Sequence, residues 1–134
     1  MLRLQAELGP QPSFAAFLDF LADGGLHKNE HWAPQTDLLL LPLAEFDYVG
    51  RVERLEKDLP AVLTRIFGQV SERSTAQYNQ HATHAHEKLK QHYDHSTLEH
   101  VNALFAADFT KLHYQVAREV DAIRLEPTDD RTQY

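Results

Sequence analysis

The sequence contains no cysteine among its 134 residues. A disulfide framework, a catalytic thiolate and a cysteine-based zinc site are therefore excluded. A chain without disulfides is compatible with a reducing compartment, and the cytoplasm is the expected location because no signal peptide or transmembrane segment is recognised either.

Positive charge and long hydrophobic runs are also scarce. The 13 Lys and Arg residues stand against 20 Asp and Glu residues, which gives a net charge of -7 with neutral histidine. Proteins that wrap nucleic acid or coat an anionic membrane need a basic excess, so neither partner is expected. The longest apolar run, residues 38–44, contains Pro42 and is too short to cross a bilayer. The first residues also lack the pattern of a signal peptide.

The remaining composition is that of a globular chain, with 43% hydrophobic and 25% charged residues. The length suits one domain, predicted over residues 1–134 with a lead-in at 1–12, a helical body at 13–122 and a flexible tail at 123–134. Ser13 is the expected N-cap of the first helix, and the pair Gly24-Gly25 is expected to end it.

Two further helices are predicted from apolar residues at helical spacing. One runs from Leu55 to Gly68, and Pro60 within it predicts a late start or a kink. The other begins at a capping box formed by Ser96 and Glu99 and carries an apolar stripe through residues 98–112. A weaker periodicity predicts a helix at residues 84–93 and a polar loop at residues 69–82.

Residues 46–53 are rich in β-formers and predict a strand, whereas residues 38–41 are four leucines whose pattern fits a helix or a buried strand. One or two strands among several helices are too little sheet for a complete α/β domain. The predicted fold class is therefore mainly α with minor β, and the imbalance suggests a portion of a larger fold.

Three separated stretches resemble the C-terminal half of carbohydrate (Golgi-type) sulfotransferases and their bacterial relatives. The first is the aromatic helix at residues 13–18 with the loop HWAPQ at residues 31–35, similar to the family's His-Trp-x-Pro-Gln loop. The second is FDYVGRVERLEKD at residues 46–58, similar to the block DF(I/V)G-x-(F/Y)E-x-L-x-x-D. The third is Tyr93-Asp94 with LFAADFTKLHY at residues 104–114, similar to a closing block in which glycine stands in place of His113.

The resemblance implies the C-terminal portion of an α/β P-loop-like sulfotransferase fold that lacks the N-terminal donor-binding half. Such enzymes transfer a sulfuryl group from phosphoadenosine phosphosulfate to a carbohydrate hydroxyl. The donor is held by an N-terminal strand–loop–helix, and the sequence shows no Gly-rich or basic loop of that kind. The chain alone is therefore expected to be inactive, and its expected partners are a glycan acceptor and either the missing half or a second copy.

His31 and Trp32 are the candidates for acceptor binding, and His31 is also the candidate catalytic base. An imidazole titrates near neutral pH and suits removal of the acceptor's proton. A structural interpretation is favoured for both residues, in which they pin the loop by packing and one hydrogen bond.

The segment around Tyr78 resembles a part of the family that comes near the nucleotide. The candidates for donor contact there are Asn79, His81, Thr83 and His84, and a polar surface loop is an equally good interpretation. The nine histidines also raise a metal hypothesis, but no HExxH pattern supports it and no metal site is predicted.

The acidic residues of the second and third blocks are interpreted as structural. Asp47, Glu53 and Asp58 are expected to cap a helix or pair with Arg51 and Arg54. Packing and helix termination are the expected roles of three residues of the third block: Asp108, Phe109 and Tyr114.

Three functional hypotheses remain open on the sequence. The first is a part of a sulfotransferase. The second is a non-catalytic helical module that self-associates through residues 38–41 and 46–53, and the third is a His-based metal binder.

Overall fold

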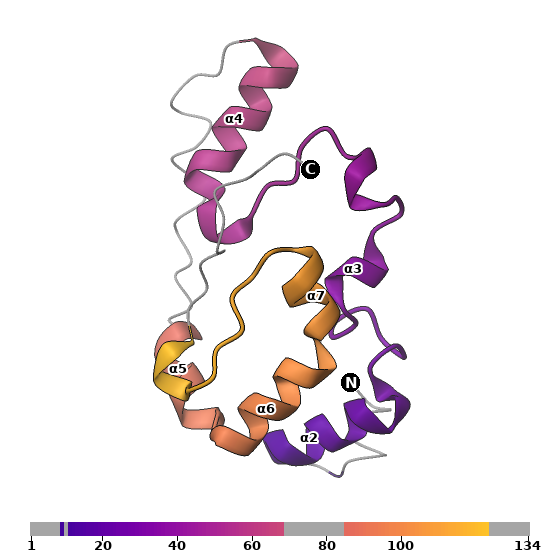
Figure 1. Ribbon diagram of the computed structural model, residues 1–134, viewed down its shortest axis with the longest axis vertical. Coiled ribbons are helices and arrows are strands. Elements are labelled where there is room, and N and C mark those ends of the chain that lie inside the picture. The colour runs from indigo at the N-terminus through magenta and orange to yellow at the C-terminus, as the bar shows by residue number, and fades with distance from the viewer. Residues whose placement is uncertain (1–8, 10, 69–84, 124–134) are drawn as a thin grey trace. The chain divides into compact units, whose positions relative to one another are not determined.

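The computed structural model describes residues 9, 11–68 and 85–123. All of the regular elements within these residues are helical (Figure 1). The chain forms two compact units. Unit 1 holds the described residues up to Leu39 and from His86 onward, and unit 2 holds those from Leu40 to Gly68 together with Ala85. The predicted single domain over residues 1–134 stays a prediction.

Unit 1 begins with helix α2, Phe14–Phe20, which continues into a wide turn at Leu21–Gly25. The Ser13 hydroxyl accepts a hydrogen bond from the Ala16 N–H at 3.1 Å, as the sequence predicts. Gly24 ends the regular helix with a φ of 89°, which a residue with a side chain rarely adopts. Gly25 is equally restricted, because a Cβ there would lie 2.5 Å from the Phe20 ring. The predicted helix start and stop are both confirmed.

The core of unit 1 consists of three buried leucines with a belt of half-buried aromatic and aliphatic residues. The buried side chains are Leu18, Leu21 and Leu26, with exposed fractions of 1%, 2% and 9%. The side chains packed around them are Phe14, Phe17, Phe20, Trp32, Val101, Leu104 and Phe105. Helix α2 therefore packs against helix α6, His95–Leu104, although the two helices lie far apart in the sequence (Figure 1).

Helix α5, Ala85–His92, leads into α6 through Tyr93 and Asp94. The predicted capping box at Ser96 and Glu99 is wrong, since the N-cap is Asp94 and its reciprocal partner is Thr97. The Asp94 carboxylate accepts from the Thr97 N–H at 2.7 Å, and the Thr97 hydroxyl accepts from the Asp94 N–H at 2.8 Å. The pair Asp94–Thr97 and the predicted pair Ser96–Glu99 both have the three-residue spacing of a capping box, and the pair that comes first in the sequence forms the cap.

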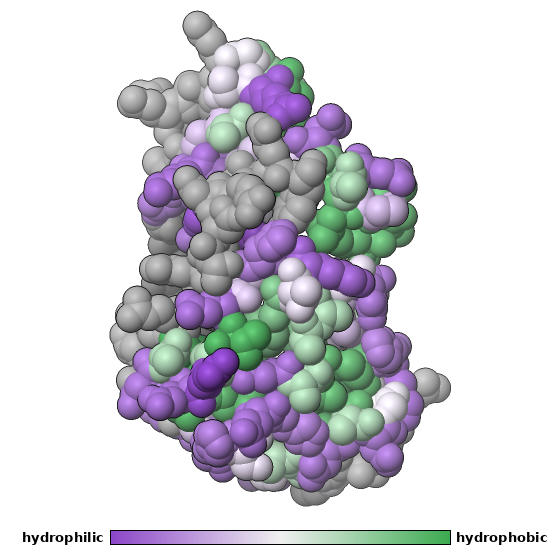
Figure 2. Space-filling view, viewed as in Figure 1, coloured by the Kyte–Doolittle hydropathy of each residue, from purple (hydrophilic) through white to green (hydrophobic). Residues whose placement is uncertain are grey.

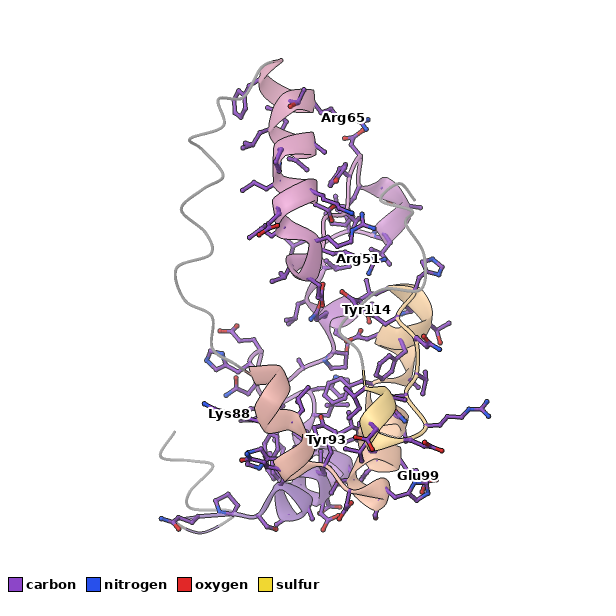
Figure 3. The ribbon with its side chains drawn as sticks, turned by 90° about the vertical axis from the view of Figure 1, so that its left-hand side faces the viewer. Arg51, Arg65, Lys88, Tyr93, Glu99 and Tyr114 are labelled. Carbon is purple, nitrogen blue, oxygen red and sulfur yellow. The ribbon has the colours of Figure 1, made fainter. Side chains whose placement is uncertain are left out.

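Tyr93 joins α5 to the core, with its ring centroid 5.0 Å from that of Phe14. Burial raises the pKa of the Tyr93 phenol above its usual value, because the charged phenolate is poorly solvated there. Figure 3 shows Tyr93 among the side chains of the helices of unit 1.

The predicted apolar stripe at residues 98–112 spans two helices rather than one. Phe105 has φ -106° and ψ 19°, and it separates α6 from α7, Ala106–Lys111. His113 then adopts a φ of 56°, and the Tyr114 N–H donates to the Phe109 carbonyl at 2.9 Å. The stripe is still the inner face, because Leu98 and Leu112 are 3% and 8% exposed.

Unit 2 contains a short helix of three residues at Leu43–Glu45, another at Val52–Arg54, and the longer α4, Leu55–Phe67. The predicted stop at Gly68 is confirmed, with a φ of 83°. Of the two outcomes predicted from Pro60, the late start is wrong, because α4 begins at Leu55 and includes Pro60, whereas the kink stays a prediction.

The predicted strand at residues 46–53 is also wrong, since the described residues contain no strand. The reason lies in the Arg51 N–H, which donates to the buried Asp58 carboxylate at 2.7 Å. A backbone group that is satisfied by a side chain is lost to a sheet ladder. The chain turns at Val52–Arg54 instead.

Of the four leucines at residues 38–41, only the first is helical. Leu38 ends the short helix α3, Gln35–Leu38, and Leu39 is extended. Figure 2 shows hydrophobic surface over the segment that follows α3. No helix within the described ranges is long and apolar enough to cross a membrane.

Leu18→Ala should lower the free energy of unfolding by about 2–5 kcal/mol, because it leaves a cavity at a fully buried site. Leu40→Ala is the matched control, since Leu40 is 96% exposed and its loss should change stability by less than about 0.5 kcal/mol. Urea denaturation followed by circular dichroism measures both. Equal losses for the two variants would contradict the core assignment.

The Asp94 cap of α6 should make the free energy of unfolding depend on pH. Hydrogen bonds from the Thr97 N–H and hydroxyl hold the pKa of Asp94 below its usual value. The unfolded state then binds more protons, so the stabilisation is complete above about pH 3.9 and is lost as the pH falls through the lowered folded pKa. Thermal unfolding should show Asp94→Ala to be less stable at pH 7, with the difference from wild type narrowing below pH 4. A difference that does not change with pH would contradict this assignment.

Candidate functional site

The loop between the turn at Leu21–Gly25 and helix α3 carries His31 and Trp32. Residues 26–34 are called the acceptor loop after the acceptor contact that the sequence predicts for these two residues, which stays a prediction. Trp32 anchors the middle of the loop. The indole N–H donates to the Gly25 carbonyl at 2.9 Å. The ring meets Phe17 and Phe20 edge-on, with centroid distances of 5.6 and 6.2 Å. Trp32 therefore has the packing and the hydrogen bond of the structural interpretation.

His31 sits at the exposed part of the acceptor loop, where Asn29 shapes the backbone. The Asn29 side-chain oxygen accepts from the His31 N–H at 2.9 Å. The Asn29 carbonyl accepts from the Trp32 and Ala33 N–H groups at 3.3 and 3.0 Å. This local pattern fixes the His31 backbone and leaves its imidazole in solvent. An exposed imidazole is accessible to a solute, whereas Trp32 is half-buried in the aromatic belt.

The end of the acceptor loop is held from the opposite end of the sequence by Asp108 on α7. Its Oδ2 accepts from the Gln35 N–H at 2.6 Å, and its Oδ1 accepts from the Thr36 N–H at 2.9 Å. The same Oδ1 accepts from the Thr36 hydroxyl at 2.6 Å. Figure 1 shows α3 and α7 side by side. The sequence interpretation of Asp108 as a residue of packing and helix termination missed this role.

Two weaker contacts lie at the surface of the loop. His27 Nδ1 is 3.0 Å from Asp37 Oδ2, with both side chains well exposed. A pair in such surroundings stabilises a fold by about 0–1 kcal/mol. The Lys28 ammonium lies 5.5 Å from the centre of the Phe20 ring, within the range of a cation–π contact. Hydrogen bonds and packing therefore hold the loop more firmly than its charge pairs.

The four residues named as donor contacts, Asn79, His81, Thr83 and His84, lie outside the described residues. Within the described residues no group of three His, Asp or Glu side chains is arranged to hold a metal ion. Two of the remaining histidines have acidic neighbours instead: His95 Nε2 is 3.4 Å from Glu99, and His100 Nδ1 is 3.8 Å from Asp19.

Of the three acidic residues singled out in the second block, one has a buried carboxylate in unit 2. Asp58, 3% exposed, accepts from the Arg51 N–H at 2.7 Å and from the Arg54 guanidinium at 3.0 Å. Figure 3 shows Arg51 near the N-terminal end of α4. The predicted structural role is confirmed for Asp58, which fixes the turn that leads into α4. Asp47 and Glu53 are exposed.

The chain matches the Sulfotransferase family over residues 4–115, which includes both the acceptor loop and Asp108. It belongs to this family. The family relation to carbohydrate sulfotransferases is also supported by individual proteins. The chain is 40% identical over 67 residues to carbohydrate sulfotransferase 14 of Mus musculus and 39% identical over 67 residues to that of Homo sapiens.

Each of these alignments covers 46% of this sulfotransferase-family chain and 18% of the relative. The chain thus spans less than a fifth of the length of the curated relatives that it matches. No solved structure matches the chain. The predicted resemblance is confirmed at the level of the family, and the roles of His31 and Trp32 stay predictions.

Proposed function

We propose that this chain forms the acceptor side of an enzyme that transfers a sulfuryl group from phosphoadenosine phosphosulfate to a carbohydrate hydroxyl. The observation that carries the proposal is the family match over residues 4–115, together with relatives that are named carbohydrate sulfotransferases. The residues of the family match include a fixed loop with an exposed imidazole, which is the local chemistry that an acceptor hydroxyl requires.

The reaction forms a bond between the acceptor oxygen and sulfur and breaks the bond between sulfur and the bridging oxygen of the donor. The acceptor hydroxyl loses its proton, and adenosine 3′,5′-bisphosphate leaves. A base near the hydroxyl is therefore needed, and a neutral imidazole is well suited at physiological pH. His31 is the proposed base, and the acceptor loop is the proposed contact surface for the sugar.

Tight donor binding is proposed to require groups that the start of the first described helix, α2, does not offer. A multiply charged anion is commonly held by backbone N–H groups at a helix N-terminus together with basic side chains. At the start of α2 the Ser13 hydroxyl already accepts one of these N–H groups, and the first turn contains no basic residue. Asn79, His81, Thr83 and His84 remain proposed donor contacts of secondary importance.

The 134-residue chain should therefore bind adenosine 3′,5′-bisphosphate more weakly than micromolar and should transfer no radiolabelled sulfuryl group by itself. Isothermal titration measures the affinity, and a micromolar constant corresponds to about -8 kcal/mol. Carbohydrates with free hydroxyls should nevertheless shift the NMR signals of the His31 ring and the acceptor-loop amides.

Two results would contradict these assignments in different ways. Micromolar binding of the bisphosphate would place the donor site within this chain. A panel of neutral and acidic oligosaccharides that shifts no acceptor-loop signal would remove the acceptor role. His31→Ala removes the proposed base while leaving the backbone hydrogen bonds of Asn29 in place, so it should abolish transfer by any enzyme that contains this chain without disturbing the loop.

A second function, a helical module that self-associates, is favoured by the exposure of residues 38–41. Leu38, Leu39, Leu40 and Leu41 are 49%, 37%, 96% and 49% exposed. Apolar area in water costs about 25 cal/mol per Å², so burial against a second copy or another part of the enzyme would stabilise this segment.

Leu39→Lys should weaken such an association before it unfolds the helices. Sedimentation equilibrium measures the association, and Gln91→Lys provides the same charge at an exposed position of α5 as a control. A chain that stays monomeric at high concentration would exclude self-association. The cytoplasmic location expected from the sequence stays a prediction.

A further inference from the structure

Helix α3 follows the acceptor loop and lacks a local cap. It has four residues, a length at which a helix in water does not persist by itself. Its N-cap residue is Pro34, whose side chain forms no capping hydrogen bond. The first N–H groups of a helix need an acceptor, and a neighbouring Ser, Thr, Asp or Asn usually supplies it.

Asp108 supplies this acceptor from α7. The Gln35 N–H and the Thr36 N–H each meet one carboxylate oxygen, at 2.6 and 2.9 Å. The Thr36 hydroxyl adds a third hydrogen bond at 2.6 Å. Hydrogen bonds to an ionised carboxylate are stronger than those between neutral groups. A residue 72 positions away in sequence thus replaces the missing local cap.

The acceptor loop consequently has two anchors, and His31 lies inside the first, one residue before Trp32, while the second begins three residues after Trp32. The first is the Trp32 indole on the Gly25 carbonyl, and the second is Asp108 on Gln35 and Thr36. The short His31–Pro34 stretch follows directly into the second anchor. Loss of the second anchor would leave the end of the loop held on its N-terminal side alone, through the Trp32 indole and the Asn29 carbonyl.

We propose that Asp108 is a positioning residue, which acts through the first turn of α3 to hold the acceptor loop, and with it His31, in one conformation for the acceptor. This inference rests on the proposed function, since it assumes that the loop meets the acceptor. Asp108 itself does not touch the reacting atoms in this assignment.

The fold of unit 1 does not depend on this carboxylate for its apolar contacts. Leu18, Leu21 and Leu26 form the buried cluster, and the residues packed around it come from α2, the acceptor loop, α6 and Phe105. Asp108 is only partly buried and contacts α3. A variant at Asp108 is therefore expected to stay folded, with its effect confined to α3 and the loop.

The experiment compares Asp108→Ala, Asp108→Asn and Thr36→Val in the full chain. In Asp108→Ala, amide hydrogen exchange at Gln35 and Thr36 should rise by about tenfold or more, and ¹⁵N relaxation should show new motion at His31. Asp108→Asn keeps one acceptor oxygen and should give an intermediate result. Thr36→Val removes a single hydrogen bond and should give the smallest change.

Asp37→Asn is the matched control, because it makes the same chemical change on α3 at an exposed residue that pairs with His27 instead. It should leave exchange at Gln35 and Thr36 as in the wild type. Exchange at Leu18 and Leu21 should stay slow in every variant and thereby report an intact core.

The exchange and relaxation measurements decide the proposal without any carbohydrate. Unchanged exchange at Gln35 and Thr36 in Asp108→Ala, or unchanged motion at His31 despite faster exchange, would overturn it. A wild-type chain whose loop responds to no carbohydrate would overturn the proposed function separately. Where the wild type does respond, Asp108→Ala should lower the carbohydrate affinity and Asp108→Asn should restore part of it.

Discussion

The carboxylate of Asp108 is the constraint on which the start of helix α3, and with it the end of the acceptor loop, depends. Three buried leucines and a belt of aromatic rings hold α2 against α6, but apolar packing has no direction and does not set the path of a polar loop. Directional hydrogen bonds set it: those of Asn29 and Trp32 hold the middle of the loop, and those of Asp108 hold its end, where two N–H groups face one carboxylate. The short α3 exists where it does because α7 supplies that acceptor.

The two compact units use the same device at different places. In unit 2 the buried Asp58 accepts from the Arg51 N–H and fixes the turn into α4, and an arginine guanidinium balances its charge. In unit 1 Asp108 fixes the turn into α3 with the help of a hydroxyl. Both carboxylates accept backbone N–H groups at a turn that leads into a helix, where those groups have no helical partner.

The sequence predicts features that depend on residues a few positions apart. The Ser13 cap, the stops at Gly24 and Gly68 and the helical face of α4 are of this kind, and all are confirmed. The strand at residues 46–53 was predicted from β-forming side chains, which carry no sign that Asp58 takes the Arg51 N–H. The partnership of Asp108 with Gln35 spans 73 positions and leaves no periodic signal in either segment. For the site, the sequence therefore located the loop and its Trp32 anchor but not the Asp108 anchor.

Trp32 has a consequence for how the two units can be observed. It is the only tryptophan of the chain, and it belongs to unit 1, where its indole is edge-on to two phenylalanines. Excitation of indole at long ultraviolet wavelengths therefore probes the surroundings of the acceptor loop and is silent about α4. A melting curve recorded by tryptophan emission describes one half of the molecule, and its departure from a curve recorded by helical signal would reveal whether the halves melt as one.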